Sequence, residues 1–162
     1  MDKIKNAAKG FTLIELLVVV LIIGILTAVA LPQYKKIIYK SKFTQATLML
    51  NSIYKAQQEY YTIHGVYAYN FLSLDIDLPK TTKTPTNYAY WDWGYCMVDG
   101  NGKYGMCGFN QARKMTWWSP DMGGARCYAA KDNSVAQEIC QAVTGKNEDQ
   151  RVPNGNDYVY YF

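Results

Sequence analysis

The chain has 162 residues, of which 49% are hydrophobic and 19% are charged, and its formal net charge at pH 7 is +4. This length accommodates one globular domain and an accessory element, which excludes two independent domains of ordinary size. Lys3, Lys5 and Lys9 against Asp2 account for +2 of that charge, so residues 11–162 carry only +2 and do not form a strongly basic, nucleic-acid-seeking body.

The N-terminus combines a short basic segment, residues 1–10, with a long apolar run over residues 11–31. A helix over this run covers roughly 30 Å, which is the thickness of the hydrocarbon core of a bilayer. A secretory signal peptide has a shorter apolar stretch, of about 7–15 residues. We therefore predict a transmembrane helix over residues 11–31. The three preceding lysines predict a cytoplasmic N-terminus and an extracytoplasmic domain.

One carboxylate, Glu15, interrupts the apolar run near its start. An unpaired carboxylate at this depth is costly. Either the side chain reaches back to the cytoplasmic interface, or it pairs with a positive charge on another molecule.

The sequence over residues 9–34 resembles the N-terminal signature of type IV pilins and of the related pseudopilins of type II secretion systems. The matching features are a basic leader that ends in Gly10, the adjacent Phe11, Glu15 at the fifth position after the leader, and Pro32 near the end of the span. Beyond residue 34 the resemblance is architectural, with an extended helix that leads into a variable head.

This resemblance implies that a prepilin peptidase cleaves between Gly10 and Phe11, removes residues 1–10 and methylates the new Phe11 amine. It also implies that Glu15 pairs with the Phe11 amine of a neighbouring subunit, which compensates both charges in an apolar setting. The implied partners are further copies of the chain and other pilins in a helical filament, the peptidase, and an inner-membrane assembly platform. The subunit would reside in the inner membrane before it enters a cell-surface pilus.

Gly24 and Pro32 are the weak points of the first part of the helix, because glycine has a low helix propensity and proline lacks a donor N–H group. In the resembled family the matching segment can lose helicity on assembly. The alternative is a tolerated kink, since both residues are common in membrane-spanning helices.

Residues 32–64 continue as an amphipathic helix, which Gly65 ends because glycine adopts the left-handed conformation at little cost. The apolar stripe has steps of three and four residues, which predicts packing on the head domain. Its members are Phe43, Ala46, Leu50, Ile53, Gln57 and Tyr60, and we expect Leu48, Met49, Tyr54 and Tyr61 to widen it.

Residues 65–162 are expected to form a globular head, which makes the fold α+β: a long N-terminal helix packed on a small antiparallel β-sheet with disulfides. Residues 66–87 read as an irregular connector. Strands are predicted at Tyr88–Val98, Lys103–Phe109 and Asp157–Phe162, and a helix over Asn133–Ala142.

Four cysteines beyond a membrane span indicate two disulfides in an oxidising compartment, with three possible connectivities. Residues 99–102 form a hairpin signal, and a turn at Asn101-Gly102 places Cys96 opposite Cys107. Directly opposite positions fit disulfide geometry. This register favours Cys96–Cys107 with Cys127–Cys140.

Catalytic and metal-binding motifs are weak. The cysteines lack the close pair that zinc sites use, and His64 stands apart from them in the sequence. Asp75 and Asp77 match the pattern of calcium ligands only in part. We therefore expect no enzyme, no cofactor and no metal.

Two surface features stay open. Trp117 and Trp118 form either a binding face or part of the core of the head. A contact with DNA on a filament is a weaker hypothesis, because the basic residues follow no recognised nucleic-acid module. These residues are Lys80, Lys83, Arg113, Lys114 and Arg126.

The sequence is therefore interpreted as a structural subunit of a type IV pilus. The alternatives are a type II secretion pseudopilin and a membrane-anchored extracytoplasmic domain that never polymerises.

Overall fold

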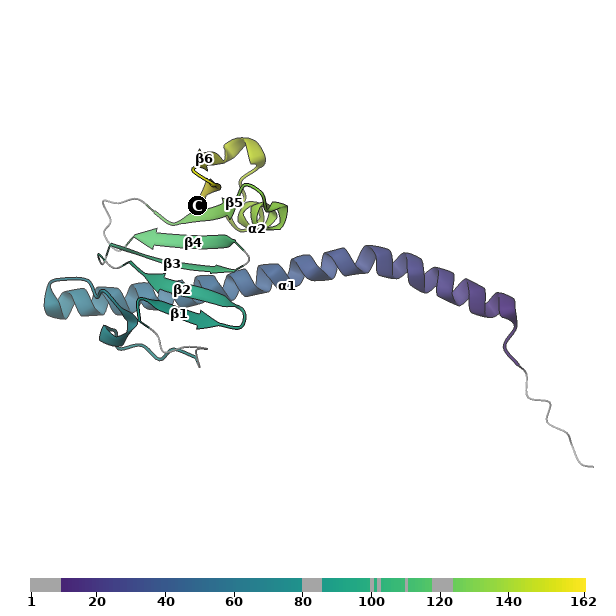
Figure 1. Ribbon diagram of the computed structural model, residues 1–162, viewed down its shortest axis with the longest axis horizontal. Coiled ribbons are helices and arrows are strands. Elements are labelled where there is room, and N and C mark those ends of the chain that lie inside the picture. The colour runs from purple at the N-terminus through teal and green to yellow at the C-terminus, as the bar shows by residue number, and fades with distance from the viewer. Residues whose placement is uncertain (1–9, 80–85, 100, 102, 110, 118–123) are drawn as a thin grey trace, which may run out of the picture. The chain divides into compact units, whose positions relative to one another are not determined.

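The computed structural model describes residues 10–79, 86–99, 101, 103–109, 111–117 and 124–162. The chain forms two compact units, which divide between Ile37 and Ile38. Helix α1, Leu13–His64, contributes to both of them (Figure 1). The second unit also contains a seven-stranded antiparallel sheet, so the predicted α+β class is confirmed.

Helix α1 ends where the sequence predicts it. Gly65 has a φ of 71°, in the left-handed region that favours glycine, and its N–H donates to the carbonyl of Tyr61 at 2.8 Å. This bond satisfies one of the last free carbonyls of the helix.

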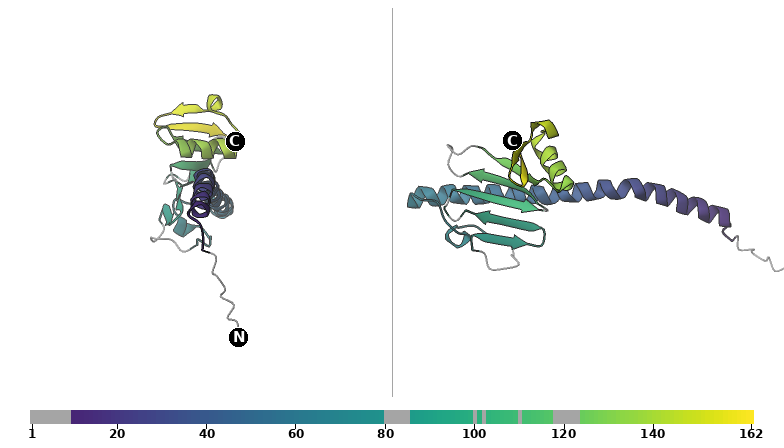
Figure 2. Two further views of the ribbon diagram at one scale, coloured as in Figure 1. Left: turned by 90° about the vertical axis from the view of Figure 1, so that its right-hand side faces the viewer. Right: turned by 45° about the horizontal axis from the view of Figure 1, so that its top comes forward.

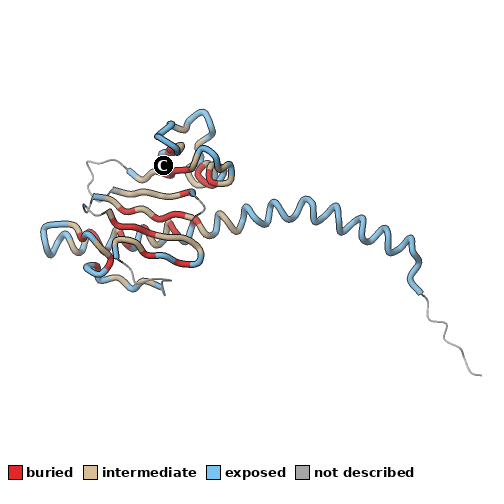
Figure 3. Tube along the Cα trace, viewed as in Figure 1, coloured by how far each residue is buried: buried red, intermediate tan, exposed pale blue. Residues whose placement is uncertain are grey.

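The buried stripe of α1 lies in its second half and packs on the sheet (Figure 3). Most of the predicted stripe is confirmed, because Phe43, Ala46, Leu50, Ile53 and Gln57 are buried, whereas Tyr60 is half-buried. Ala56 was not predicted and is buried as well. The expected widening is wrong at Leu48 and Tyr61, which are 61% and 45% exposed. Leu48 lies two residues before Leu50, which places it about 200° around the helix, away from the sheet.

Seven strands form one sheet in the order β1-β2-β3-β4-β5-β7-β6 (Figure 1). Their bounds are Tyr88–Trp91 (β1), Gly94–Val98 (β2), Tyr104–Phe109 (β3), Ala112–Trp117 (β4), Arg126–Ala130 (β5), Val152–Asn154 (β6) and Asp157–Tyr161 (β7). Every neighbouring pair is antiparallel.

The prediction of a single strand over Tyr88–Val98 is wrong, because this segment is itself a hairpin. Trp91 lies opposite Gly94, which leaves Asp92 and Trp93 in a two-residue turn. The backbone of β2 comes so close to β3 here that a Cβ on Gly94 would lie 2.4 Å from the carbonyl oxygen of Gly108. Glycine at this position is therefore a requirement of the close approach.

The next hairpin, β2–β3, has the predicted register, with Cys96 opposite Cys107 and Val98 opposite Gly105. Gly100 and Gly102 of its turn lie outside the described residues. The strand predicted at Asp157–Phe162 is present as β7, whereas β4, β5 and β6 were not predicted.

Helix α2, Ser134–Thr144, begins after the cap residue Asn133, whose side chain accepts the N–H of Ala136, and ends at Gly145 with a φ of 70°. It packs on the same face of the sheet as the second half of α1 (Figure 2). In the described part of the connector before β1 there is a short 3-10 helix, η1, Phe71–Ser73. Another 3-10 helix, η3, Glu148–Gln150, follows α2.

Two clusters form the core between the helices and the sheet. The first joins α1 to β1, β2, β3 and the connector, and it contains Cys96 and Cys107. The second joins α1 to α2 and the strands β4, β5 and β7, and it contains Cys127 and Cys140. Each cysteine pair therefore lies in a different part of the core.

Candidate assembly segment and disulfides

The junction between Gly10 and Phe11 lies before the start of α1 and is exposed, with Phe11 77% accessible. A Cβ on Gly10 would have no atom within 4 Å. The folded chain therefore does not itself require glycine here. Lys3, Lys5, Lys9 and the rest of the predicted leader before Gly10 lie outside the described residues.

Glu15 caps the first turn of its own helix. Its Oε2 accepts the backbone N–H of Thr12 at 2.8 Å and the Thr12 hydroxyl at 2.6 Å. In return, the N–H of Glu15 donates to Oγ1 of Thr12 at 3.2 Å. This reciprocal arrangement is a capping box: the Thr12 side chain accepts the backbone N–H of Glu15, and the Glu15 side chain accepts the backbone N–H of Thr12.

Thr12 was not predicted to be part of this site. The signal was available, because a threonine followed three residues later by glutamate marks the start of a helix. The box leaves a carboxylate at the beginning of an apolar helix, held by its own chain and open to solvent in the monomer.

The apolar part of α1 has no cover in the described structure. Large apolar side chains from Phe11 to Leu31 are all exposed, by between 43% and 77%. Length and composition allow α1 to cross a membrane. Soluble monomers rarely expose continuous apolar surfaces of this size, so this segment needs a bilayer or neighbouring chains.

Gly24 and Pro32 lie within a continuous helix in the isolated chain. Pro32 lacks the N–H that would bond to the carbonyl of Ala28, so one hydrogen bond of α1 is missing at this point. The expected loss of helicity on assembly stays a prediction.

Both cysteine pairs are disulfide-bonded, in the connectivity that the hairpin register favours. Cys96–Cys107 bridges directly opposite residues of β2 and β3, with the Cα atoms 4.0 Å apart. Cys127–Cys140 connects β5 to α2, with the Cα atoms 5.6 Å apart. All four cysteines are fully buried.

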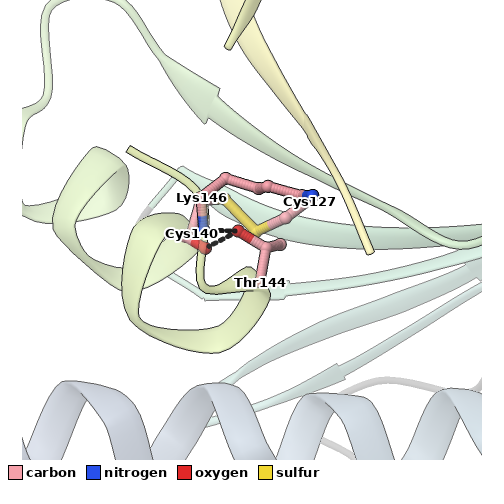
Figure 4. The surroundings of a disulfide bond; sticks show 4 residues. All are labelled: Cys127, Cys140, Thr144 and Lys146. Carbon is pink, nitrogen blue, oxygen red and sulfur yellow. Dashed lines mark hydrogen bonds between the residues drawn. A yellow bond between two sulfur atoms is a disulfide. The ribbon is translucent and has the colours of Figure 1, made fainter. Parts of the chain in front are cut away.

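The second disulfide is attached to the end of α2. The Thr144 hydroxyl donates to the carbonyl of Cys140 at 2.7 Å, and the N–H of Lys146 donates to the same hydroxyl at 3.3 Å (Figure 4). The disulfide and these bonds together hold the last turn of α2 against β5.

The described basic residues of the proposed DNA contact, Arg113, Lys114 and Arg126, do not gather into one site. Arg113 and Lys114 are adjacent in β4, so their side chains lie on opposite faces of the sheet. Arg113 pairs with Asp157. Lys114 lies 4.5 Å above the Phe162 ring, and burial lowers the pKa of its amine. Arg126 lies 5.0 Å from the Tyr161 ring.

The rest of this group gives no further support for a nucleic-acid site. Lys80, Lys83 and Trp118 lie outside the described residues, and the side chain of Trp117 is not described. The basic side chains that are described make local contacts with carboxylates and rings of the head itself.

His64, Asp75 and Asp77 were weighed as possible catalytic or metal-binding residues. His64 stacks on Tyr60 with 4.0 Å between ring centroids, and its Nδ1 lies 3.0 Å from the Tyr60 carbonyl oxygen. Asp75 and Asp77 are exposed. Among the described residues, no three or more His, Cys, Asp or Glu side chains form a group that could hold a metal ion.

Comparisons with known proteins place the N-terminal segment in a recognised group. A family described as the prokaryotic N-terminal methylation motif matches residues 5–31. The type IV major pilin protein PilE1 of Neisseria gonorrhoeae is 42% identical over 73 residues, which are 45% of this chain and 44% of the relative.

Two relatives from other genera show the same partial coverage. The fimbrial protein EcpC of Eikenella corrodens is 44% identical over 64 residues, or 40% of this chain and 42% of the relative. The type IV major pilin protein PilA of Myxococcus xanthus is 46% identical over 60 residues, or 37% and 27%. The chain therefore matches less than half the length of these curated relatives.

Proposed function

We propose that this chain, a homologue of type IV major pilins that carries the N-terminal methylation motif, is a structural subunit of a type IV pilus. The observation that carries the proposal is the exposed apolar half of α1, which overlaps the matched motif and carries one carboxylate, Glu15. A monomer in water gains nothing from such a surface, whereas a membrane and then a bundle of helices cover it.

In this proposal, prepilin peptidase cleaves between Gly10 and Phe11, removes residues 1–10 and methylates the Phe11 amine. The new amine then pairs with Glu15 of a neighbouring subunit, which would exchange the Thr12 donors of the capping box for an ion pair. Residues 11–31 anchor the subunit and later enter the filament core, while residues 32–64 support the head at 65–162.

Before assembly, the subunit crosses the inner membrane once, with a cytoplasmic N-terminus and an extracytoplasmic head. Two buried disulfides suit this location, because they persist in an oxidising compartment. The assembly platform extracts the subunit into a filament of identical chains and other pilins. The role is structural, and the proposal assigns no catalytic step to the chain.

The test is the mature N-terminus, determined by mass spectrometry on sheared surface filaments and on membranes of the same cells. We expect a methylated Phe11 in the filament fraction. A methylated Phe11 that occurs in membranes alone would favour a secretion pseudopilin. An intact residue 1 in membranes, with no filament fraction, would contradict the proposal and favour an anchored domain that does not polymerise.

The matching variant is Gly10→Val, which should retain the leader because the larger side chain obstructs the peptidase. Since a Cβ at this position meets no atom of the chain, the variant leaves the fold unchanged. A Gly10→Val protein that is cleaved as the wild type is would argue against this junction.

A further inference from the structure

All the charged residues in the segment that follows the apolar run are lysines. Residues 35–42, the lysine segment, contain Lys35, Lys36, Lys40 and Lys42. Neither Asp nor Glu occurs between Glu15 and Glu59, so no carboxylate within this stretch of the sequence neutralises the lysines. Four like charges in eight residues repel one another unless an anionic partner is present.

These lysines are accessible. Lys35, Lys36 and Lys40 are exposed, and Lys42 is half-buried, with its amine 4.9 Å above the Phe109 ring. Lys36 also makes a contact within the chain. The lysine segment therefore presents positive charge to whatever surrounds this part of α1.

The distance of the lysine segment from the apolar run indicates where it lies relative to a bilayer. Lys35 and Lys36 follow the last apolar residue of the run, Leu31, by four and five residues, or roughly 6–8 Å of helix. The headgroup layer on each side of a bilayer is about 5–8 Å thick, so both amines lie at headgroup depth. Tyr34, 62% exposed, precedes them at the position where interfacial aromatic rings occur.

The lysine segment also conflicts with the usual distribution of charge. The positive-inside rule keeps lysines on the cytoplasmic side of a span, yet four lie here on the proposed extracytoplasmic side, against three in residues 1–10. A favourable interaction on that side would offset the conflict.

We propose that the lysine segment binds the headgroups of anionic phospholipids, such as phosphatidylglycerol, in the outer leaflet of the membrane that holds the unassembled subunit. This inference rests on the membrane anchoring in the proposed function. Long lysine side chains bend toward phosphate groups while their stems stay on the helix, so Lys40 also reaches the headgroup layer. Lys42 stays over the Phe109 ring and adds positive charge near the surface. The subunit loses these contacts when it leaves the bilayer.

The test reconstitutes the full chain in phosphatidylcholine vesicles that contain either spin-labelled phosphatidylglycerol or spin-labelled phosphatidylcholine. Electron paramagnetic resonance then gives the relative association of the two lipids with the protein. The test variant replaces all four lysines of the segment with glutamine: Lys35→Gln, Lys36→Gln, Lys40→Gln and Lys42→Gln. The matched control removes the same charge elsewhere, by Lys55→Gln, Lys103→Gln, Lys131→Gln and Lys146→Gln.

We expect the test variant to lose at least about half of the wild-type preference for phosphatidylglycerol, and the control to keep it. Lysines of residues 1–10 contribute equally to all three proteins, so the difference reports on the lysine segment. In about 1 M salt, where the screening length is about 3 Å, the wild type should lose its preference.

Three results would overturn the inference: no preference in a membrane-held wild type, the same preference in the test variant, or an equal loss in the control. A test variant with normal lipid preference but reduced filament yield would instead assign the lysines to a neighbouring subunit. Release of the wild type from membranes by alkaline carbonate would overturn the membrane anchoring as well, so the two failures are distinguishable.

Discussion

The two halves of α1 have the same backbone conformation but different surroundings. In the first half, up to Ile37, the large apolar side chains are exposed on all sides. In the second half, apolar residues recur in steps that place Leu50 and Ile53 against the sheet, while the polar residues other than Gln57 are exposed or half-buried. An apolar stripe on one side of a helix is buried by packing on the rest of the monomer. A helix that is apolar on all sides is buried only by a membrane or by other chains.

This difference separates two tasks along a single helix. Substitutions in the second half should change the free energy of unfolding of the head. Substitutions in the first half should leave the head intact and change the association of the chain with membranes or with other subunits. The following variants test this separation in order of decreasing effect.

The largest effect is expected for Glu15→Ala, which should reduce the yield of sheared filaments by more than about tenfold, because the Phe11 amine of the neighbour loses its partner in an apolar setting. The protein should still be processed and remain in membranes, as blots of both fractions would show. Glu59→Ala removes an exposed carboxylate from the second half of α1 and serves as the control. Equal filament yields for the two variants would contradict the role of Glu15.

In the second half, Leu50→Ala should lower the free energy of unfolding of the head by about 2–5 kcal/mol, because it leaves a cavity at a fully buried position. Leu48→Ala makes the same chemical change two residues away, where the side chain is exposed, and should cost less than about 0.5 kcal/mol. Denaturant unfolding of the full chain in mild detergent, followed by near-UV circular dichroism, measures both. A similar decrease in the free energy of unfolding for both variants would mean that burial in the stripe does not stabilise the head.

A smaller loss is expected for Gln57→Met. The buried amide of Gln57 donates to the carbonyl of Ala68 and accepts the N–H of Ala68, both at 2.9 Å. Methionine leaves both backbone groups unpaired, which should cost about 1–3 kcal/mol in the same unfolding measurement. Gln45→Met, at an exposed position of the same half, is the control. A neutral Gln57→Met variant would show that water replaces the amide.

The smallest effect concerns the start of α1. Thr12→Ala removes the cap and should destabilise the first turn by about 1 kcal/mol, which corresponds to about fivefold faster exchange of the hydrogen-bonded amides of Glu15 and Leu16. Thr12→Ser retains the hydroxyl and should keep wild-type exchange. The unfolding of the head should be unchanged in both variants. Unaltered exchange in Thr12→Ala would mean that the capping box contributes little.

The sequence was most informative where a local signal decides the structure. The steps of three and four residues predict α1, and Gly65 predicts its end. The hairpin signal at residues 99–102 predicts the register that brings Cys96 to Cys107. Each of these depends on contacts between residues close in the chain, whose geometry is nearly independent of the rest of the molecule.

The errors arose where contacts between strands decide the structure. Tyr88–Val98 has the residues of one long strand, yet it folds back at Asp92 and Trp93, and Gly94 then lies against Gly108 of β3. Strand β4 was not predicted because Arg113 and Lys114 interrupt its apolar pattern. In the structure their long side chains lie over the rings of Tyr128 and Phe162. Such partners are far apart in the sequence, and periodicity alone does not identify them.

By itself, the sequence determined the apolar span, the amphipathic continuation of the helix, the basic segment that follows the span, and the pairing of Cys96 with Cys107. Only the tertiary structure decided the order of the seven strands, the turn at Asp92 and Trp93, and the attachment of Gln57 to Ala68. The physical reason is range: helix periodicity and turn chemistry act over a few residues, whereas burial is set by segments that meet only when the chain folds.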